Sequence, residues 1–252
     1  YNRLIESVDK PLLNRALKGT YPPGSTIKPM LGMAALHYGI RGSVDETWCP
    51  GWYILKGTDI KKGDWKKEGH GNTDLRKAIA ESCDVYFYSL ANDLGIDKIG
   101  DALSQFGFGT KTQIDIGDES SGLLPSKEWK RKIYNEAWYP GETINVGIGQ
   151  GALLVTPMQL AVATAAVANR GKVLKPHLFS EAHDPLSDVI HLKNTTEELK
   201  IVIESDAHWD IIVSSMIDVV HSAHGTARGS GQGAEYQFAG KSGTAQVFSQ
   251  DS

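Results

Sequence analysis

The chain has 252 residues, enough for one large domain or two small ones and enough to bury a core without disulfide bonds. Hydrophobic residues make up 40% and charged residues 22% of it, the balance of a globular protein. The formal net charge of −4 lacks the basic excess of nucleic-acid-binding domains, and two cysteines, Cys49 and Cys83, exclude a disulfide-rich scaffold. No apolar run reaches the roughly 20 residues that a membrane-spanning helix needs.

The two ends of the chain suggest a fragment. The chain begins with Tyr1 rather than Met, shows no signal peptide, and ends at Ser252 soon after a segment with strand character. We therefore expect a domain over residues 1–252 that is trimmed at both ends, with any membrane anchor lying outside it.

The first half of the chain alternates predicted helices with irregular segments. After a polar, turn-rich start, a helix is predicted over 25–38, because apolar side chains recur on one stripe and Gly39 follows its end. This stripe comprises Ile27, Met30, Leu31 and Ala34. Residues 40–72 are rich in Gly, Lys and Trp without a clear period, and we expect an irregular excursion there. Further helical patterns cover 74–81, 84–94 and 97–105.

The second half of the chain shows fewer clear patterns. Loops and short strands are expected over 110–155 and 172–203. A helix begins at Thr156-Pro157 and runs to about Asn169, and a further amphipathic helix covers 207–222. The last segment, Tyr236 to Phe248, has the pattern of a β-strand that carries glycines. Because helices dominate and strands do not alternate regularly with them, we predict an α+β fold.

The first motif with chemical potential is Ser25-Thr26-Ile27-Lys28 at a predicted helix start. Residues three apart share a helix face, so Lys28 can reach the Ser25 hydroxyl. A serine becomes nucleophilic when a base removes its proton, and a lysine can serve if a buried, cation-rich site lowers its pKa. Taken alone the motif is weak, because Ser-x-x-Lys occurs by chance and is usually a solvated helix start.

Two later motifs complete the set. Ser82-Cys83-Asp84 lies at a predicted break between helices, where Ser82 can relay a proton and Asp84 can bind a substrate amide. Lys241-Ser242-Gly243-Thr244 lies in the predicted terminal strand. There Gly243 allows a ligand to approach the backbone, and the other three residues can bind a carboxylate. A helix N-cap and a polar edge strand are the ordinary interpretations of these two motifs in isolation.

The motif set Ser-x-x-Lys, Ser-Asp-Asn and Lys-Thr-Gly is typical of penicillin-binding proteins and class A β-lactamases, and here the three occur in that order. Over roughly residues 1–250 the chain resembles class B penicillin-binding proteins, most of all the elongation-specific subfamily, penicillin-binding protein 2 of Gram-negative rods. The segments that carry this resemblance are Tyr21–Pro29, Cys49–Trp52, Asp64–Lys67, Gly69–Gly71, Gly147–Gly151, Thr156-Pro157 and Lys241–Gln246. The resemblance implies a transpeptidase fold like that of serine β-lactamases, with a helical subdomain and an antiparallel sheet flanked by helices.

The resemblance also implies a mechanism that needs no cofactor. Ser25 would attack the carbonyl of the penultimate D-Ala of a peptidoglycan stem peptide, Lys28 would take its proton, and Ser82 would pass a proton towards the leaving D-Ala. The carboxylate would be held by Lys241, Ser242 and Thr244, and the N–H groups of Ser25 and Thr244 would form the oxyanion hole. A β-lactam would mimic this substrate. One departure is Asp84, where the family usually has Asn, so an amide donor is lost there.

Partners and location follow from the same resemblance. The stem peptide and β-lactam antibiotics are the expected ligands. A RodA-type glycan polymerase and the elongation complex that maintains cell shape are the expected partners. The expected location is the periplasm, with a tether to the inner membrane through an N-terminal helix outside this sequence.

A metal site is a further expectation within residues 40–83. Asp45, Asp64, His70 and Cys83 offer the oxygen, nitrogen and sulfur ligands that zinc accepts. Some relatives in the resembling subfamily bind zinc through two Asp, a His and a Cys at this spacing, so a structural zinc beside the second motif is expected. Two alternatives stay open: the four residues are unconnected, or Cys83 forms a disulfide with Cys49.

Three other activities share this fold. A class A β-lactamase needs a glutamate that activates the deacylating water, and Glu142-Thr143-Ile144-Asn145 has the wrong spacing for the Glu-x-x-x-Asn pattern. A D,D-carboxypeptidase differs only in using water as acceptor. A non-catalytic β-lactam sensor would retain acylation without cross-linking.

Overall fold

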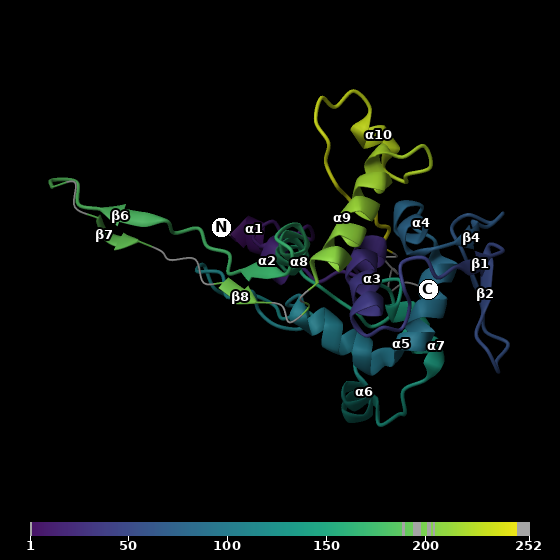
Figure 1. The fold of residues 1–252 in the computed structure, drawn as a ribbon. Coiled ribbons are helices and arrows are strands. Elements are labelled where there is room, and N and C mark those ends of the chain that lie inside the picture. The colour runs from purple at the N-terminus through teal and green to yellow at the C-terminus, as the bar shows by residue number, and fades with distance from the viewer. Residues whose placement is uncertain (1, 188–189, 194–197, 201–202, 204, 246–252) are drawn as a thin grey trace.

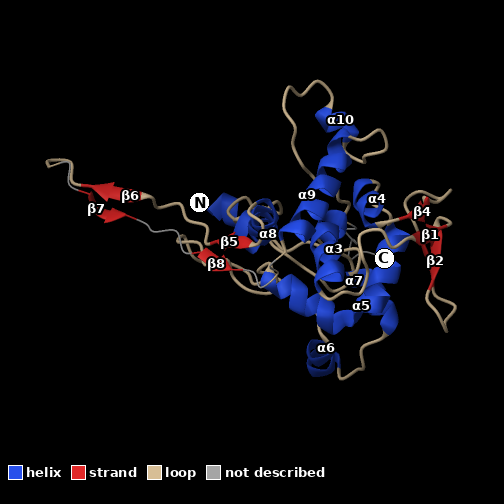
Figure 2. Cartoon of the chain, viewed as in Figure 1, coloured by secondary structure: helices blue, strands red, loops and turns tan. Residues whose placement is uncertain are grey.

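The computed structural model describes residues 2–187, 190–193, 198–200, 203 and 205–245, and helices dominate it (Figures 1 and 2). Its helices are α1 (Asn2–Ile5), α2 (Arg15–Lys18), the 3₁₀-helix η1 (Gly24–Ile27), α3 (Lys28–His37), α4 (Leu75–Ala80), α5 (Asp84–Gln105), α6 (Lys127–Tyr134), α7 (Pro140–Val146), α8 (Pro157–Ala168), α9 (Asp206–His221) and α10 (Arg228–Gly231). Its strands are β1 (Thr47–Cys49), β2 (Trp52–Ile54), β3 (Lys61–Gly63), β4 (Gly71–Thr73), β5 (Lys172–Leu174), β6 (Glu181–His183), β7 (Ile190–Lys193) and β8 (Glu198–Lys200). No helix in these residues is long and apolar enough to span a bilayer.

Helix α3 lies at the centre of the molecule. The residues of the predicted apolar stripe are buried, and burial extends to every residue from Lys28 to Leu36, because α5 and α9 both pack against this helix. Gly32 permits the close packing: a Cβ there would lie 3.0 Å from Leu75 Cδ1 and 3.1 Å from Ile212 Cδ1. Burial of the first residue, Lys28, fixes the position of the first motif relative to the core.

The helices predicted over 84–94 and 97–105 form one element, α5, whose helical backbone is broken at a single residue. Gly95 has φ 73° and ψ 160°, which is not helical, so two helical segments meet there as predicted. The helices predicted over 74–81, from 156 to 169 and over 207–222 are confirmed as α4, α8 and α9, with ends that differ by one or two residues. Local periodicity and capping were sufficient signals for these elements.

The excursion over 40–72 is more regular than predicted. Strand β1 pairs antiparallel with β4, which places Cys49 opposite Gly71, and β2 pairs antiparallel with β3. Gly51 and Gly69 have positive φ, and the two segments approach so closely that a Cβ on either would overlap backbone atoms of the other. Each of these strands has three residues, which is too short to show a period in the sequence.

Two helices replace the loops and strands predicted over 110–155. Ser126 caps α6 by accepting from Trp129 N at 3.0 Å, and Tyr139 N donates to Glu142 at the start of α7. Extended pairing in this region is limited to isolated bridges, of which Leu123 with Leu154 is one. The prediction was wrong here because each helix is too short to show a clear period, although its N-terminal cap is visible in the sequence.

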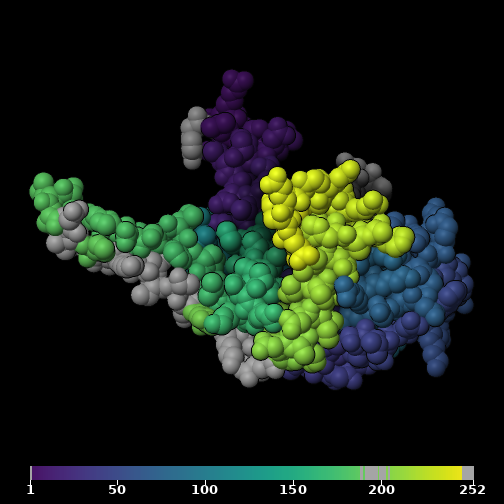
Figure 3. All heavy atoms as spheres, turned by 45° about the horizontal axis from the view of Figure 1, so that its top comes forward, coloured from purple at the N-terminus to yellow at the C-terminus, as the bar shows by residue number. Residues whose placement is uncertain are grey.

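The terminal segment is not the predicted strand: none of the described residues 236–245 is a strand, and 246–248 lie outside the described residues. Its backbone N–H groups bond to helix α9 instead, from Gly240 to Met216 O (3.1 Å) and from Phe238 to His221 Nε2 (3.2 Å). Within the described residues the strands form two-stranded antiparallel sheets, one of which, β6 with β7, lies on an arm that projects from the body (Figures 1 and 3). The α+β class is confirmed.

Candidate active site

Ser25 lies in η1, one turn before α3. The turn is held by Thr26 Oγ1, which donates to Pro23 O at 2.7 Å, and by Gly24 N, which donates to Gly149 O at 2.8 Å. Gly24 has positive φ and lies so close to Thr244 that a Cβ would overlap the Thr244 carbonyl. The local sequence therefore places Ser25 against both a Gly-rich turn and the third motif.

The three motifs meet at one pocket with a volume of about 740 Å³. Its lining residues are Ser25, Lys62, Gly63, Asp64, Trp65, Ser82, Asp84, Tyr88, Asn145, Ile148, Gln150, Thr226, Ser242, Gly243 and Thr244. Lys28 lies beneath this surface with no exposed side-chain area. A pocket of this size accommodates a peptide end or a small molecule.

Lys28 connects the first motif to the second. Its Nζ donates to Ser82 O at 2.8 Å and to Ser82 Oγ at 3.3 Å, and forms an ion pair with Asp84 Oδ1 at 2.7 Å. The amine also lies 5.3 Å from the centre of the Phe87 ring. Because a buried amine is costly without partners, these contacts hold the Lys28 amine beside Ser82 and Asp84 of the second motif.

The second motif has a strained backbone. Ser82 adopts φ 56°, a left-handed conformation that is unfavourable for a non-glycine residue. Cys83 N donates to Ala78 O at 3.0 Å, and Cys83 Sγ then caps α5 by accepting from Tyr86 N at 3.4 Å. The break between α4 and α5 thus points the Ser82 hydroxyl at Lys28 and into the pocket.

The third motif approaches Ser25 from the other side. A Cβ on Gly243 would lie 2.6 Å from Thr26 Cγ2, so glycine permits this contact. Gln150 Nε2 donates to Thr244 O at 3.0 Å, and the Ser242 hydroxyl lies 2.6 Å from the Thr226 hydroxyl. The motif is therefore positioned by a few polar contacts rather than by pairing in a sheet.

Lys241 is a cation whose charge is sensitive to its surroundings. Burial, together with the positive charge of Lys28, lowers its pKa to about 7, and the negative charge of Asp84 opposes this shift. Its Nζ donates to Ser242 O at 3.0 Å. An anionic ligand in the pocket would stabilise the charged form.

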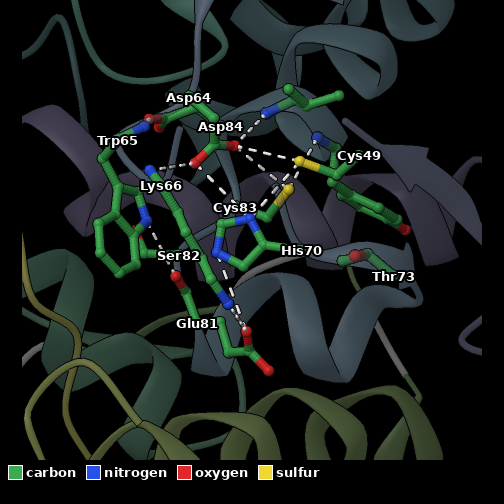
Figure 4. A network of polar contacts seen from close by, with 12 residues as sticks. Cys49, Asp64, Trp65, Lys66, His70, Thr73, Glu81, Ser82, Cys83 and Asp84 are labelled. Carbon is green, nitrogen blue, oxygen red and sulfur yellow. Dashed lines mark hydrogen bonds and ion pairs between the residues drawn. The ribbon is translucent and has the colours of Figure 1, made fainter. Parts of the chain in front are cut away.

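Beside the second motif, Cys49, Asp64, His70 and Cys83 form a buried cluster whose ligand atoms all lie within 4.8 Å of one another (Figure 4). Cys49 Sγ lies 3.6 Å from Asp64 Oδ2 and 3.5 Å from His70 Nδ1. Cys83 Sγ lies 3.4 Å from Asp64 Oδ2. Strands β1 and β4 and the N-terminus of α5 bring these residues together.

This cluster differs at one position from the expected ligand set. Asp45 is exposed, and its carboxylate accepts from Gly42 N at 2.7 Å in the turn before β1, so its place is taken by Cys49. The reason is the register of β1 and β4, which pairs Cys49 with Gly71, next to His70. Both cysteines are free thiols, so neither the disulfide nor the set of unconnected residues describes this site.

The donor atoms of the cluster suit a metal ion. Two sulfur atoms, one nitrogen and one oxygen make a set that zinc accepts. His70 Nδ1 faces the cluster, while the buried Nε2 has no hydrogen-bond partner and lies 3.9 Å from Glu81 Oε2. Burial lowers the pKa of His70, so its ring favours the neutral form that binds metals. The residues therefore fit a tetrahedral zinc.

Hydrogen bonds link the cluster to the second motif. Asp64 Oδ2 accepts from Val85 N at 3.0 Å, and the neighbouring Trp65 N donates to Asp84 Oδ2 at 3.3 Å. Trp65 Nε1 donates to Glu81 O at 3.1 Å, just before Ser82 (Figure 4). A change in the cluster is therefore transmitted to the residues on both sides of Cys83.

Several pocket residues were not predicted from the sequence. Asn145 precedes the Gly-rich segment Gly147–Gly151, Gln150 lies within it, and Lys62 reaches the pocket from β3. Thr226 follows α9 in a loop without a recognisable motif. The signal available for Cys49 was chemical: a buried thiol is a better zinc ligand than an exposed carboxylate.

Comparison with known proteins places these features in a family. The family model of the penicillin-binding protein transpeptidase domain matches residues 2–252. The chain is 47% identical over 249 residues to the peptidoglycan D,D-transpeptidase MrdA of Acinetobacter baumannii, a match that covers 99% of the chain and 36% of that protein. It is similar to the crystal structure of PBP2 of Pseudomonas aeruginosa in complex with WCK 5153, with a TM-score of 0.89 and 44% identity, covering 98% of this chain and 55% of that one.

A further similar structure is PBP2 of Helicobacter pylori in its complex with MreC, with a TM-score of 0.84 and 33% identity, covering 98% of this chain and 44% of that one. The chain spans between 36% and 40% of the length of the first curated relatives that it matches. Because the family match extends over nearly all residues and the three motifs converge at one pocket, the chain belongs to the family of penicillin-binding protein transpeptidase domains, in its PBP2 branch.

Proposed function

We propose that the chain is a D,D-transpeptidase that cross-links peptidoglycan stem peptides through an acyl-enzyme on Ser25, and that residues 1–252 act as one transpeptidase domain. The observation that carries the proposal is the convergence of Ser25, the buried amine of Lys28 and the third motif at one pocket. The D,D-transpeptidase name of the A. baumannii relative supports the reaction class.

Acylation would begin with attack of Ser25 Oγ on the carbonyl carbon of the penultimate D-Ala. Lys28 Nζ, as the neutral amine, would accept the serine proton, and the Asp84 carboxylate 2.7 Å away would stabilise the ammonium that forms. Ser82 Oγ, 3.3 Å from Lys28 Nζ, passes a proton to the leaving D-Ala nitrogen as the peptide bond breaks. The amine of a second stem peptide then attacks the ester and releases Ser25.

The third motif would recognise the donor end of the substrate. Lys241, Ser242 and Thr244 hold the C-terminal carboxylate, and the N–H groups of Ser25 and Thr244 stabilise the tetrahedral oxyanion. The close contact between Gly243 and Thr26 supports this arrangement, because it keeps the third motif beside the nucleophile. A β-lactam carries a carboxylate and a reactive carbonyl at similar positions and would acylate the same serine.

The proposed metal is a structural zinc held by Cys49, Asp64, His70 and Cys83, in place of the set with Asp45. It would supply folding energy and fix Cys83 between Ser82 and Asp84, and it takes no part in acyl transfer. Metal analysis of purified protein tests this: one zinc per chain is expected, and a metal-free protein that keeps its fold and melting temperature would contradict it.

The location and the partners are proposed from membership of the PBP2 branch. The proposed place of action is the periplasm, at the inner membrane, with a RodA-type polymerase and the elongation complex as partners and no nucleic acid. The structure of the H. pylori relative with MreC supports an assembly of this kind.

The experiment that tests the function supplies a pentapeptide donor with and without an amine acceptor. A transpeptidase forms the cross-linked dimer, whereas release of D-Ala with water as sole acceptor would indicate a carboxypeptidase. Rapid nitrocefin turnover would indicate a β-lactamase; against that activity, Glu142 is engaged by Lys130 at 2.7 Å and by Tyr139 N at 2.8 Å. Acylation without any product would indicate a sensor.

A further inference from the structure

Thr226 occupies a fixed position between the second and third motifs. Its N–H donates to Ala80 O at 3.2 Å, two residues before Ser82, and the next N–H, of Ala227, donates to Val219 O at 2.9 Å. The turn is pressed against the end of α9, because a Cβ on Gly225 would overlap the carbonyl oxygens there. Backbone contacts to α4 and α9 therefore set where the Thr226 side chain points.

That side chain points at the third motif. Thr226 Oγ1 lies 2.6 Å from Ser242 Oγ, a short hydrogen bond in which either hydroxyl can donate, and both residues line the pocket. The backbone oxygen of Ser242 accepts from Lys241 Nζ at 3.0 Å. Ser242 is thus oriented by a threonine from outside the motif as well as by its own lysine.

The two hydroxyls behave as one donor towards an anion. A carboxylate only accepts hydrogen bonds, so recognition requires a proton that points into the pocket. The pair has two protons, of which one is used between Thr226 and Ser242, and the other stays available to a ligand whichever residue donates. Because hydrogen bonds in a chain polarise one another, the outer donor is strengthened as well as oriented.

We infer that Thr226 is a positioning residue for carboxylate recognition, which orients the Ser242 hydroxyl towards the C-terminal carboxylate of the substrate or β-lactam. The inference rests on the proposed function, which assigns the third motif to that carboxylate. It extends the carboxylate site to a loop that the three motifs do not include. It also ties this site through Ala80 to the segment that carries Ser82.

The test compares Thr226→Val, which removes the hydroxyl at constant shape, with Thr226→Ser, which keeps it. Acylation of the full chain is followed with benzylpenicillin and with its methyl ester, in which the carboxylate is masked. For Thr226→Val we expect acylation by benzylpenicillin to fall roughly tenfold, the effect of a hydrogen bond to a charged group. The loss should appear in the half-saturating concentration rather than in the limiting rate.

The acylation of Thr226→Val by the methyl ester should stay within about twofold of the wild-type value. Thr226→Ser should react with benzylpenicillin as the wild type does. The control is Thr164→Val, since Thr164 is exposed on α8 and donates only within its helix. Equal losses with both ligands, or no loss with either, would overturn the inference. If the wild-type protein is not acylated at all, it is the proposed function that fails.

Discussion

The two sides of the pocket are held in different ways. Ser82, Cys83 and Asp84 lie between two helices, with Lys28 buried below and the cluster of Cys49, Asp64, His70 and Cys83 behind. The third motif is coil, and its last residues, Gly243 and Thr244, are exposed. Hydrogen bonds with Gln150 and Thr226 position it, and Gly240, just before it, donates to Met216 O of α9. Burial therefore fixes the side that is proposed to move protons, whereas a few polar contacts fix the side that is proposed to recognise the ligand.

This difference predicts which substitutions affect the stability of the fold and which affect ligand recognition alone. Changes below the second motif should alter both the chemistry and the stability of the fold, because buried groups lose their partners. Changes around the third motif should alter ligand recognition and leave the fold nearly intact. Four substitutions or conditions test this division.

The largest effect is expected for Lys28→Met. Loss of the base should slow acylation roughly 10³-fold, within the range found for general base catalysis, and the Asp84 carboxylate left behind should destabilise the fold. Single-turnover acylation by a fluorescent penicillin and thermal unfolding measure the two effects. Acylation within tenfold of the wild type would remove Lys28 from the role of base.

The next effect concerns the metal cluster. Cys49→Ser should lose the zinc and destabilise the protein by about 3 kcal/mol, because a structural metal contributes folding energy directly. The matched control is Asp45→Asn, which should retain the metal and the melting temperature, since Asp45 lies in a turn outside the cluster. Zinc content and thermal unfolding provide the readouts, and metal loss in the control alone would restore the ligand set expected from the sequence.

A smaller effect is expected for Gly243→Ala. The added Cβ would lie 2.6 Å from Thr26 Cγ2, so the exposed third motif must move away from Ser25, a misplacement that costs roughly 10²-fold in acylation rate. Acylation should slow accordingly while the melting temperature changes little. Gly229→Ala is the control, because a Cβ there meets no atom within 4 Å. Equal behaviour of the two variants would show that the third motif is free to adjust.

The smallest effect is a pH dependence of recognition. The pKa of Lys241 is lowered to about 7 by burial and by Lys28, so its charge is present below that pH and is lost above it. Between pH 6 and pH 8 the charged fraction falls about tenfold, and the half-saturating concentration of a penicillin should rise by up to that factor. Lys241→Arg keeps the charge and should flatten the profile; the same slope in both proteins would exclude Lys241 as its origin.

The parts of the site that the sequence predicted are local. Ser25 and Lys28 lie three residues apart at a helix start, and the helix that follows Thr156 carries its own capping signal. These features are visible in a short window of sequence. The family resemblance then identified the three motifs as parts of one site.

The parts that escaped prediction depend on distant segments. Cys49 joins the cluster through the register of β1 and β4, and Asp45, only four residues away, is excluded by the same pairing. The segment before the third motif bonds to α9 and the motif itself bonds to Thr226, so its strand-like sequence does not decide its conformation. Strand pairing and loop docking are tertiary choices, which local pattern leaves open.

The most direct measurement is the site of acylation. Protein treated with benzylpenicillin is digested and the labelled peptide is mapped by mass spectrometry, with Ser25→Ala and Ser82→Ala as the matched pair. We predict one label per chain on Ser25 in the wild type and no label in Ser25→Ala. In Ser82→Ala the label should still form on Ser25, but at a lower rate. A label that persists in Ser25→Ala, or that maps to Ser82, would contradict the assignment of Ser25 as the nucleophile.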